Sequence, residues 1–212
     1  MKQSIKIAVL GGTGKAGKYL VKRLQEQGYS LKLLLRDPSR FEGEQTHVEI
    51  VQGDARDYEA ILSLLKGCDA VISALGQPVG EPTIFSEATR NILKAMEACG
   101  IERYIVITGL NVDTPSDHKS PHTKFSTDWM KTNFPKTTLD KQVEFEVLSA
   151  SKVRWTLVRL PMIEQTDRSG AIHVSLEDCP GQNISATDLA DFLISQLDDR
   201  EYECAAPFIA SV

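Results

Sequence analysis

A run of glycines directly after the first apolar segment is the feature that most constrains how this chain can fold. Ile5–Leu10 is short, aliphatic apart from one lysine, and typical of a buried strand. It leads into Gly11–Gly17, of sequence GGTGKAG, and Lys15–Gln27 then repeats apolar residues at helical spacing. Glycines in such a strand–turn–helix unit let the backbone approach a pyrophosphate closely, and free N–H groups at the helix N-terminus attract its charge. We therefore predict that this turn binds the pyrophosphate of a dinucleotide.

The rest of the chain repeats the same alternation of apolar strands and amphipathic helices. The predicted strands are Ile5–Leu10, Ser30–Leu35, Val48–Val51, Ala70–Ala74, Tyr104–Thr108 and Trp155–Arg159. The predicted helices are Lys15–Gln27, Tyr58–Lys66, Thr83–Ala98 and Thr137–Ser149. Strands separated by helices indicate βαβ units and a parallel sheet covered on both faces. The predicted fold class is therefore α/β, a Rossmann-type, doubly wound, mostly parallel sheet.

The length of 212 residues fits a single domain over residues 1–212, with residues 160–212 as a small extension on the substrate side. Within this extension, Ser185–Asp188 is typical of a helix start, and Cys204–Ile209 is a candidate last strand. Asn111–Lys136 breaks the alternation, because it is long, polar and without clear periodicity. We predict that this segment is a functional loop or lid.

The composition excludes several classes of protein. A hydrophobic content of 42% indicates a folded chain, and a net charge of −5 without a block of Lys or Arg argues against a nucleic-acid partner. No segment resembles a signal peptide or is long enough to cross a bilayer, so we expect no membrane partner. The four cysteines are not at metal-ligand spacing. We expect reduced thiols, no metal and a cytoplasmic protein.

The residue that follows the second predicted strand bears on the choice of cofactor. NAD-selective sites place an acidic residue there to hold the ribose 2′-OH, whereas here Leu35 is followed by Arg36. A guanidinium group suits a phosphate dianion, which favours NADP(H) over NAD(H). Asp37 complicates this prediction, since it could hold a ribose hydroxyl, and Arg36 could also be a solvated surface residue.

Two further strand ends extend the predicted cofactor site across the sheet. Gly53-Asp54-Ala55 follows the third strand, and Asp54 is placed to accept a hydrogen bond from the adenine amino group. Ala74-Leu75-Gly76 ends the fourth strand and would flank the ribose and the pyrophosphate. The alternative is ordinary loop chemistry, because strand ends favour Gly and Asp in any case.

These motifs together resemble the atypical short-chain dehydrogenases/reductases, in the group of flavin reductase/biliverdin-IX-beta reductase and the NmrA-like proteins. The residues that carry the resemblance are Gly11–Gly17, Arg36-Asp37, Gly53-Asp54, Ala74–Gly76, Thr108-Gly109, Trp155–Pro161 and Ile184–Leu189. The resemblance implies a nicotinamide near the ends of the fifth and sixth strands. It implies Thr108 as the active-site Ser/Thr, and Pro161 and Met162 against the nicotinamide. It also implies a monomer or a weak homodimer.

The chain departs from this family at the Tyr-x-x-x-Lys motif. Lys141 stands where the family has its lysine, but Thr137 stands four residues earlier in place of the tyrosine. A threonine hydroxyl is too weak an acid to replace a phenol, which argues against ordinary alcohol dehydrogenase chemistry. Hydride transfer to a conjugated acceptor such as a flavin needs less help from a protein acid. His118 and His122 are candidate proton donors, because imidazole titrates near neutral pH.

Two functions follow from these residues. The first is an NADPH-dependent reductase of a small planar or conjugated molecule, on which Phe125 and Trp129 could stack, unless they only anchor the loop. The second is a non-catalytic NADP(H)-sensing protein of NmrA-like type. The predicted catalytic residues are Thr108, Lys141 and His122. The predicted cofactor-binding residues are Gly11, Thr13, Gly14, Lys15, Ala16, Gly17, Arg36, Asp37, Asp54, Ala55, Ala74, Leu75, Gly76, Thr108, Pro161 and Met162.

Overall fold

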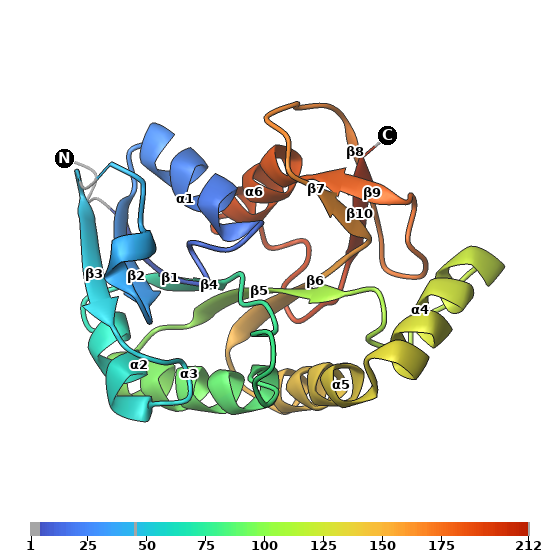
Figure 1. Cartoon of the computed structure of the whole chain (residues 1–212), viewed down its shortest axis with the longest axis horizontal. Helices are drawn as coiled ribbons and strands as arrows, with labels where there is room; N and C mark the ends of the chain where they lie inside the picture. The colour runs from blue at the N-terminus through green and yellow to red at the C-terminus, as the bar shows by residue number, and fades with distance from the viewer. Residues whose placement is uncertain (1–4, 45, 212) are drawn as a thin grey trace.

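An eight-stranded sheet forms the centre of the computed structural model, which describes residues 5–44 and 46–211 (Figure 1). Its strand order is β3-β2-β1-β4-β5-β6-β10-β8. The strands are β1 Lys6–Leu10, β2 Ser30–Leu35, β3 Val48–Gln52, β4 Ala70–Ser73, β5 Arg103–Gly109, β6 Arg154–Leu160, β8 Ile172–Ser175 and β10 Phe208–Ser211. All pairs are parallel except β10 with β8. The predicted mostly parallel, doubly wound sheet is confirmed.

Helices cover both faces of this sheet (Figure 1). On one face α1, Gly17–Glu26, contacts α6, Ala186–Ser195. On the other face α3, Phe85–Cys99, packs between α2, Tyr58–Leu65, and α5, Pro135–Ser149. A short 3₁₀ helix, Pro38–Arg40, follows β2. In the described part of the chain, no helix has the length and apolar character required to span a membrane.

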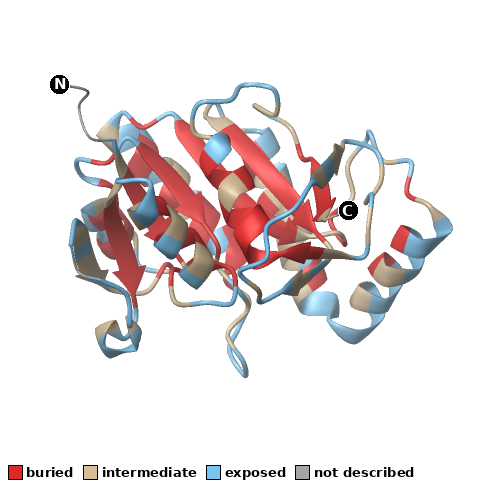
Figure 2. Cartoon of the chain, turned by 90° about the horizontal axis from the view of Figure 1, so that it is seen from above, coloured by how far each residue is buried: buried red, intermediate tan, exposed pale blue. Residues whose placement is uncertain are grey.

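The core divides into two halves because alternate residues of each strand point to opposite faces. In β1, Ile7 and Val9 pack with α1 and α6, whereas Ala8 and Leu10 pack with α2 and α3. The central strands are buried on both faces, as Figure 2 shows by their colour. This double burial explains why the strands appear in the sequence as continuous apolar runs.

The segment 111–136 differs from the predicted irregular loop, because it contains the helix α4, Pro121–Asn133. Ser120 caps this helix by accepting a hydrogen bond from the Thr123 amide, and Pro121 occupies its first turn. Thr123 and Thr127 are its buried residues. α4 projects from the end of the sheet beyond α5 (Figure 1 and Figure 2).

The connection between β5 and α4 is fixed by a buried cation. The guanidinium of Arg159 in β6 donates to Asp117 Oδ1 at 2.6 Å and to the carbonyl of Ala206 at 2.8 Å. It also lies 3.5 Å from the ring centroid of Phe208 in β10. Lys119 adds a second buried cation, bonded to Asp113 at 2.6 Å. The connection that precedes α4 is therefore held against the sheet by the bonds of Arg159 and Lys119.

The C-terminal region contains elements that the sequence does not predict. β7, Met162–Glu164, pairs in parallel with β9, Asn183–Ser185, and β8 lies at the edge of the main sheet. The predicted helix start is confirmed, since Ser185 Oγ accepts from the Asp188 amide at 2.9 Å at the beginning of α6. β10 begins four residues later than the predicted last strand.

Candidate functional site

The glycine turn between β1 and α1 has no room for a side chain at Gly11 or Gly17. Gly11 has a φ of +74°, and a Cβ on it would lie 2.6 Å from the Ala74 carbonyl carbon. A Cβ on Gly17 would overlap the Gly11 carbonyl oxygen and lie 2.9 Å from the Gly12 Cα. No side chain caps α1 at Ala16, and its first turn carries no acidic residue. The turn thus forms a cradle with free helix N–H groups, which fits a cofactor pyrophosphate.

A cavity of about 430 Å³, here called the loop cavity, opens beside this cradle at the carboxyl ends of β1, β2 and β4. It lies where the strand order reverses between β1 and β4, the usual ligand position in such sheets. Nine predicted cofactor residues line it: Gly11, Thr13, Gly14, Arg36, Asp37, Ala55, Ala74, Leu75 and Gly76. Arg40, which the sequence offers as an additional contact beside Arg36, also lines it, whereas Gln77 and Ile84 line it and were not predicted. Ala16 and Gly17 are buried in the cradle, and the Lys15 side chain is exposed.

The guanidinium of Arg36 at this cavity forms an ion pair with Glu81. Its Nη1 lies 2.6 Å from Glu81 Oε1, and Arg56 Nη1 lies 3.2 Å from Glu81 Oε2. Hydrogen bonds from both arginines lower the pKa of Glu81, and the bond to Glu81 raises the pKa of Arg36. Glu81 and Arg56 were missed because they lie far from Arg36 in the sequence.

The two acidic residues predicted at this site both have local donors. Asp37 Oδ1 accepts from the amide and the hydroxyl of Ser39, at 3.1 and 2.6 Å, and so caps the short 3₁₀ helix. These bonds lower the pKa of Asp37. Asp54 accepts from the Arg56 amide at 2.9 Å and from Arg56 Nη1 at 3.2 Å. Neither carboxylate needs a ligand to find a hydrogen-bond partner.

Thr108 and Lys141 meet at the end of β5. Lys141 Nζ donates to Thr108 Oγ1 at 3.2 Å and lies 4.0 Å from the ring centroid of Phe85. Thr108 is buried, and burial lowers the pKa of Lys141. Lys141 and Thr137 line a cavity of about 1080 Å³, here called the lysine cavity, whose other wall is Gly76–Thr83. The structure thus places Lys141 one helical turn from Thr137. Thr137 occupies the position of the family's tyrosine and has no phenol to act as an acid.

Glu144 is a buried carboxyl one turn beyond Lys141 that the sequence prediction missed. Its Oε1 accepts from Thr89 Oγ1 at 2.9 Å, and Thr89 Oγ1 lies 3.3 Å from the Tyr104 hydroxyl. Its Oε2 is buried without a hydrogen-bond partner among the described residues. Burial raises the pKa of Glu144 to about 7. A sequence signal was present, because Lys141, Glu144 and Leu148 lie on one helical face.

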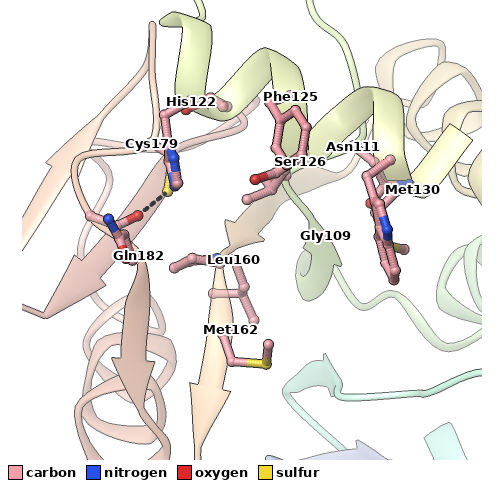
Figure 3. Close-up of a pocket in the computed structure, with 15 residues that line it drawn as sticks. Gly109, Asn111, His122, Phe125, Ser126, Met130, Leu160, Met162, Cys179 and Gln182 are labelled. Atoms are coloured by element: carbon pink, nitrogen blue, oxygen red, sulfur yellow. Dashed lines mark hydrogen bonds between the residues drawn. The ribbon is translucent and has the colours of Figure 1, made fainter.

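A third cavity, of about 450 Å³ and here called the apolar cavity, lies between α4, the end of β6 and the segment before β9 (Figure 3). Its residues are Gly109, Leu110, Asn111, His122, Thr123, Phe125, Ser126, Trp129, Met130, Leu160, Pro161, Met162, Cys179, Gly181 and Gln182. The side chains of Phe125, Trp129 and Met162 are 72%, 51% and 73% exposed. Such exposure of large apolar groups around a hollow indicates a binding surface.

The two candidate histidines differ in position. His122, at the start of α4, lines the apolar cavity. His118 is exposed, and its Nδ1 lies 3.6 Å from Glu177 Oε2. Neither lies in hydrogen-bond contact with Thr108 or Lys141. Across residues 5–44 and 46–211, no group of three His, Cys, Asp or Glu side chains gathers as a metal site.

Comparison with known proteins shows to which family the chain belongs. The family model described as NAD(P)H-binding matches residues 11–200. The chain belongs to this NAD(P)H-binding family. Isoflavone reductase homolog P3 of Arabidopsis thaliana is 34% identical over 121 residues, which are 52% of this chain and 37% of that protein. Cinnamoyl-CoA reductase 1 of Petunia hybrida is 21% identical over 196 residues, covering 79% of this chain and 59% of that protein. The chain spans less than two thirds of either relative.

Solved structures share the fold over nearly the whole chain. ChuY, an anaerobilin reductase from Escherichia coli O157:H7, superposes with a TM-score of 0.79 at 16% identity, covering 97% of both chains. A short-chain dehydrogenase/reductase from Veillonella parvula in complex with NADP superposes with a TM-score of 0.77 at 15% identity, covering 99% of this chain and 95% of that one. The resemblance to NAD(P)-binding reductases stated from the sequence is confirmed at the level of family and fold.

Proposed function

We propose that the protein is an NADPH-dependent reductase that transfers hydride to a small planar or conjugated acceptor bound in the apolar cavity. The observation that carries the proposal is that neighbouring cavities share lining residues. Gly76, Gln77 and Pro78 line both the loop cavity and the lysine cavity, and Met130 lines both the lysine cavity and the apolar cavity. We place the nicotinamide along these shared residues, between the glycine cradle and an acceptor beside α4.

The cradle of residues 11–17 would hold the cofactor pyrophosphate, and Arg36 with Arg40 would hold the 2′-phosphate of NADP(H). When bound, the nicotinamide supplies the hydride. Guanidinium groups at the end of β2 favour NADP(H) over NAD(H), because a phosphate dianion accepts bidentate bonds that a hydroxyl cannot.

Thr108, whose neighbour Gly109 lines the apolar cavity, would orient a carbonyl or carboxamide oxygen. An ammonium group has only donors, so in the bond from Lys141 Nζ the hydroxyl oxygen of Thr108 acts as acceptor. The Thr108 proton then remains free to donate to the acceptor molecule or to the nicotinamide. His122 in the apolar cavity is a proton source, and the aromatic side chains of α4 supply a stacking surface that excludes water.

The proposal is tested by incubating the protein with NADPH and a panel of flavins, quinones and dyes, while the absorbance of the reduced nicotinamide is followed. Loss of absorbance that depends on acceptor and protein supports the reductase. Tight NADPH binding without turnover of any acceptor would instead favour a non-catalytic NADP(H)-sensing protein.

Replacing Arg36 with alanine is expected to weaken NADP⁺ binding roughly 10- to 100-fold, the range for a lost hydrogen bond to a charged group. NAD⁺ binding is expected to change less than about 3-fold, because NAD⁺ has no phosphate for the guanidinium to bind. Titration of both cofactors measures this, with the exposed Arg168→Ala as control. Equal losses for the two cofactors would remove Arg36 from the 2′-phosphate site.

Replacing Thr108 with valine is expected to lower turnover by about 10-fold, because the acceptor loses a hydrogen bond while the shape of the site is kept. NADP⁺ affinity should stay within about 2-fold, since the glycine cradle is untouched. Steady-state rates and cofactor titration separate these effects. Thr132→Val, on the exposed surface of α4, is the control. Unchanged turnover in Thr108→Val would exclude the threonine from the reaction.

A further inference from the structure

Glu81 brings two guanidinium groups together at the edge of the loop cavity. Arg36 reaches it from the end of β2, at 2.6 Å, and Arg56 reaches it from the β3–α2 connection, at 3.2 Å. Each arginine bonds a different oxygen of the carboxylate. Two arginines that converge on one anion form the arrangement that binds a phosphate group.

The segment that carries Glu81 is folded on itself and tied to the body by these arginines. The Gln77 side-chain amide donates to the carbonyls of Pro78, Glu81 and Pro82 at 3.0, 3.0 and 3.2 Å. Arg56 Nη2 donates to the Pro82 carbonyl at 3.0 Å. Residues 77 and 78 line the loop cavity, and residues 76–83 form a wall of the lysine cavity. The position of Glu81 is thus linked to the walls of both cavities.

We infer that Glu81 is a specificity-determining residue that occupies Arg36 and Arg56 in place of the cofactor 2′-phosphate and is displaced when NADP(H) binds. The inference rests on the proposed placement of NADP(H) at Arg36. A phosphate dianion carries more charge than a carboxylate and therefore takes the arginines from it. NAD(H) carries no such phosphate and leaves the Glu81 ion pairs in place. The competition lowers the affinity for NADP(H) alone.

The test is a titration of wild type and Glu81→Gln with NADP⁺, NAD⁺, adenosine 2′-monophosphate and adenosine. Removing the competing charge is expected to raise the affinity for NADP⁺ and for adenosine 2′-monophosphate by roughly 5-fold. This factor corresponds to the upper range of free energies measured for exposed ion pairs. The affinities for NAD⁺ and adenosine should change by less than about 2-fold. The matched control is Glu87→Gln, since Glu87 is an exposed glutamate in the first turn of α3. This substitution should leave all four affinities unchanged.

Adding Arg36→Ala to Glu81→Gln should cancel the gain, because the competition acts through the guanidinium. Weaker or unchanged binding of the 2′-phosphate ligands in Glu81→Gln would overturn the inference, as would an equal gain for the ligands without a 2′-phosphate. This result depends on the placement of the 2′-phosphate at Arg36 but not on turnover. The reductase proposal fails when the wild type binds NADPH and turns over no acceptor, whereas the inference fails on the ratio of affinities between variant and wild type.

Discussion

Replacing Gly17 with alanine is expected to weaken NADP⁺ binding by roughly 10- to 100-fold. The added Cβ would overlap the Gly11 carbonyl and lie 2.9 Å from the Gly12 Cα, so both backbones must separate. Overpacking of this kind costs about 1–3 kcal/mol, and the separation moves the amides that form the cofactor cradle. The bound state needs the closed cradle, and a cost of about 1–3 kcal/mol corresponds to roughly 5- to 150-fold in affinity, a range centred on the expected loss. Titration with NADP⁺ measures the loss directly.

Gly28→Ala is the matched control, at the opposite end of α1. Gly28 has a φ of +81°, and a Cβ on it would meet no atom within 4 Å. An alanine there is strained by about 1–2 kcal/mol without touching the cradle. It should therefore lower the free energy of unfolding, measured in urea, but leave NADP⁺ binding unchanged. If Gly17→Ala binds NADP⁺ as tightly as wild type, the close approach of Gly17 to Gly11 has no role in the cofactor site.

The sequence was sufficient for the half of the site that depends on local geometry. β2 was predicted at its observed bounds, because a strand buried on both faces is a continuous apolar run between polar residues. The glycine at residue 17 was predictable because its close contacts, with Gly11 and Gly12, lie within the same turn, whereas the close contact of Gly11 is with Ala74 at the end of β4. The placement of Arg36 at the end of β2 follows from the same local reasoning.

The apolar cavity and the Arg36–Glu81 pair depend on contacts that the local sequence does not contain. α4 buries Thr123 and Thr127 and exposes Phe125 and Trp129, so its apolar residues do not mark a buried helical face. The partner of Arg36 lies 45 residues further along the chain, in a segment without periodicity. Tertiary packing alone decides that this segment reaches the arginines.

Glu144 is expected to make the stability of the protein fall between pH 4.5 and pH 7. Burial raises the pKa of this carboxyl from 4.5 to about 7 in the folded state. In this range the unfolded chain releases the proton while the folded chain keeps it, so rising pH favours unfolding. Below pH 4.5 both states are protonated, and above pH 7 both are ionised, so the contribution is constant outside the range. At about 1.4 kcal/mol for each tenfold change in proton affinity, the loss is about 3 kcal/mol.

Glu144→Gln should remove this pH dependence, because the amide oxygen still accepts the bond from Thr89 but cannot ionise. Urea unfolding at pH 5 and pH 8 measures the difference. Wild type is expected to lose about 2.5 kcal/mol more than Glu144→Gln between the two pH values, because the carboxyl of the unfolded chain is already mostly ionised at pH 5. Glu146→Gln, an exposed position two residues along α5, controls for the loss of a negative charge from this helix and should behave as wild type. An identical pH dependence in wild type and Glu144→Gln would mean that Glu144 ionises in the folded protein as it does in water, and that its burial next to Lys141 does not hold its proton.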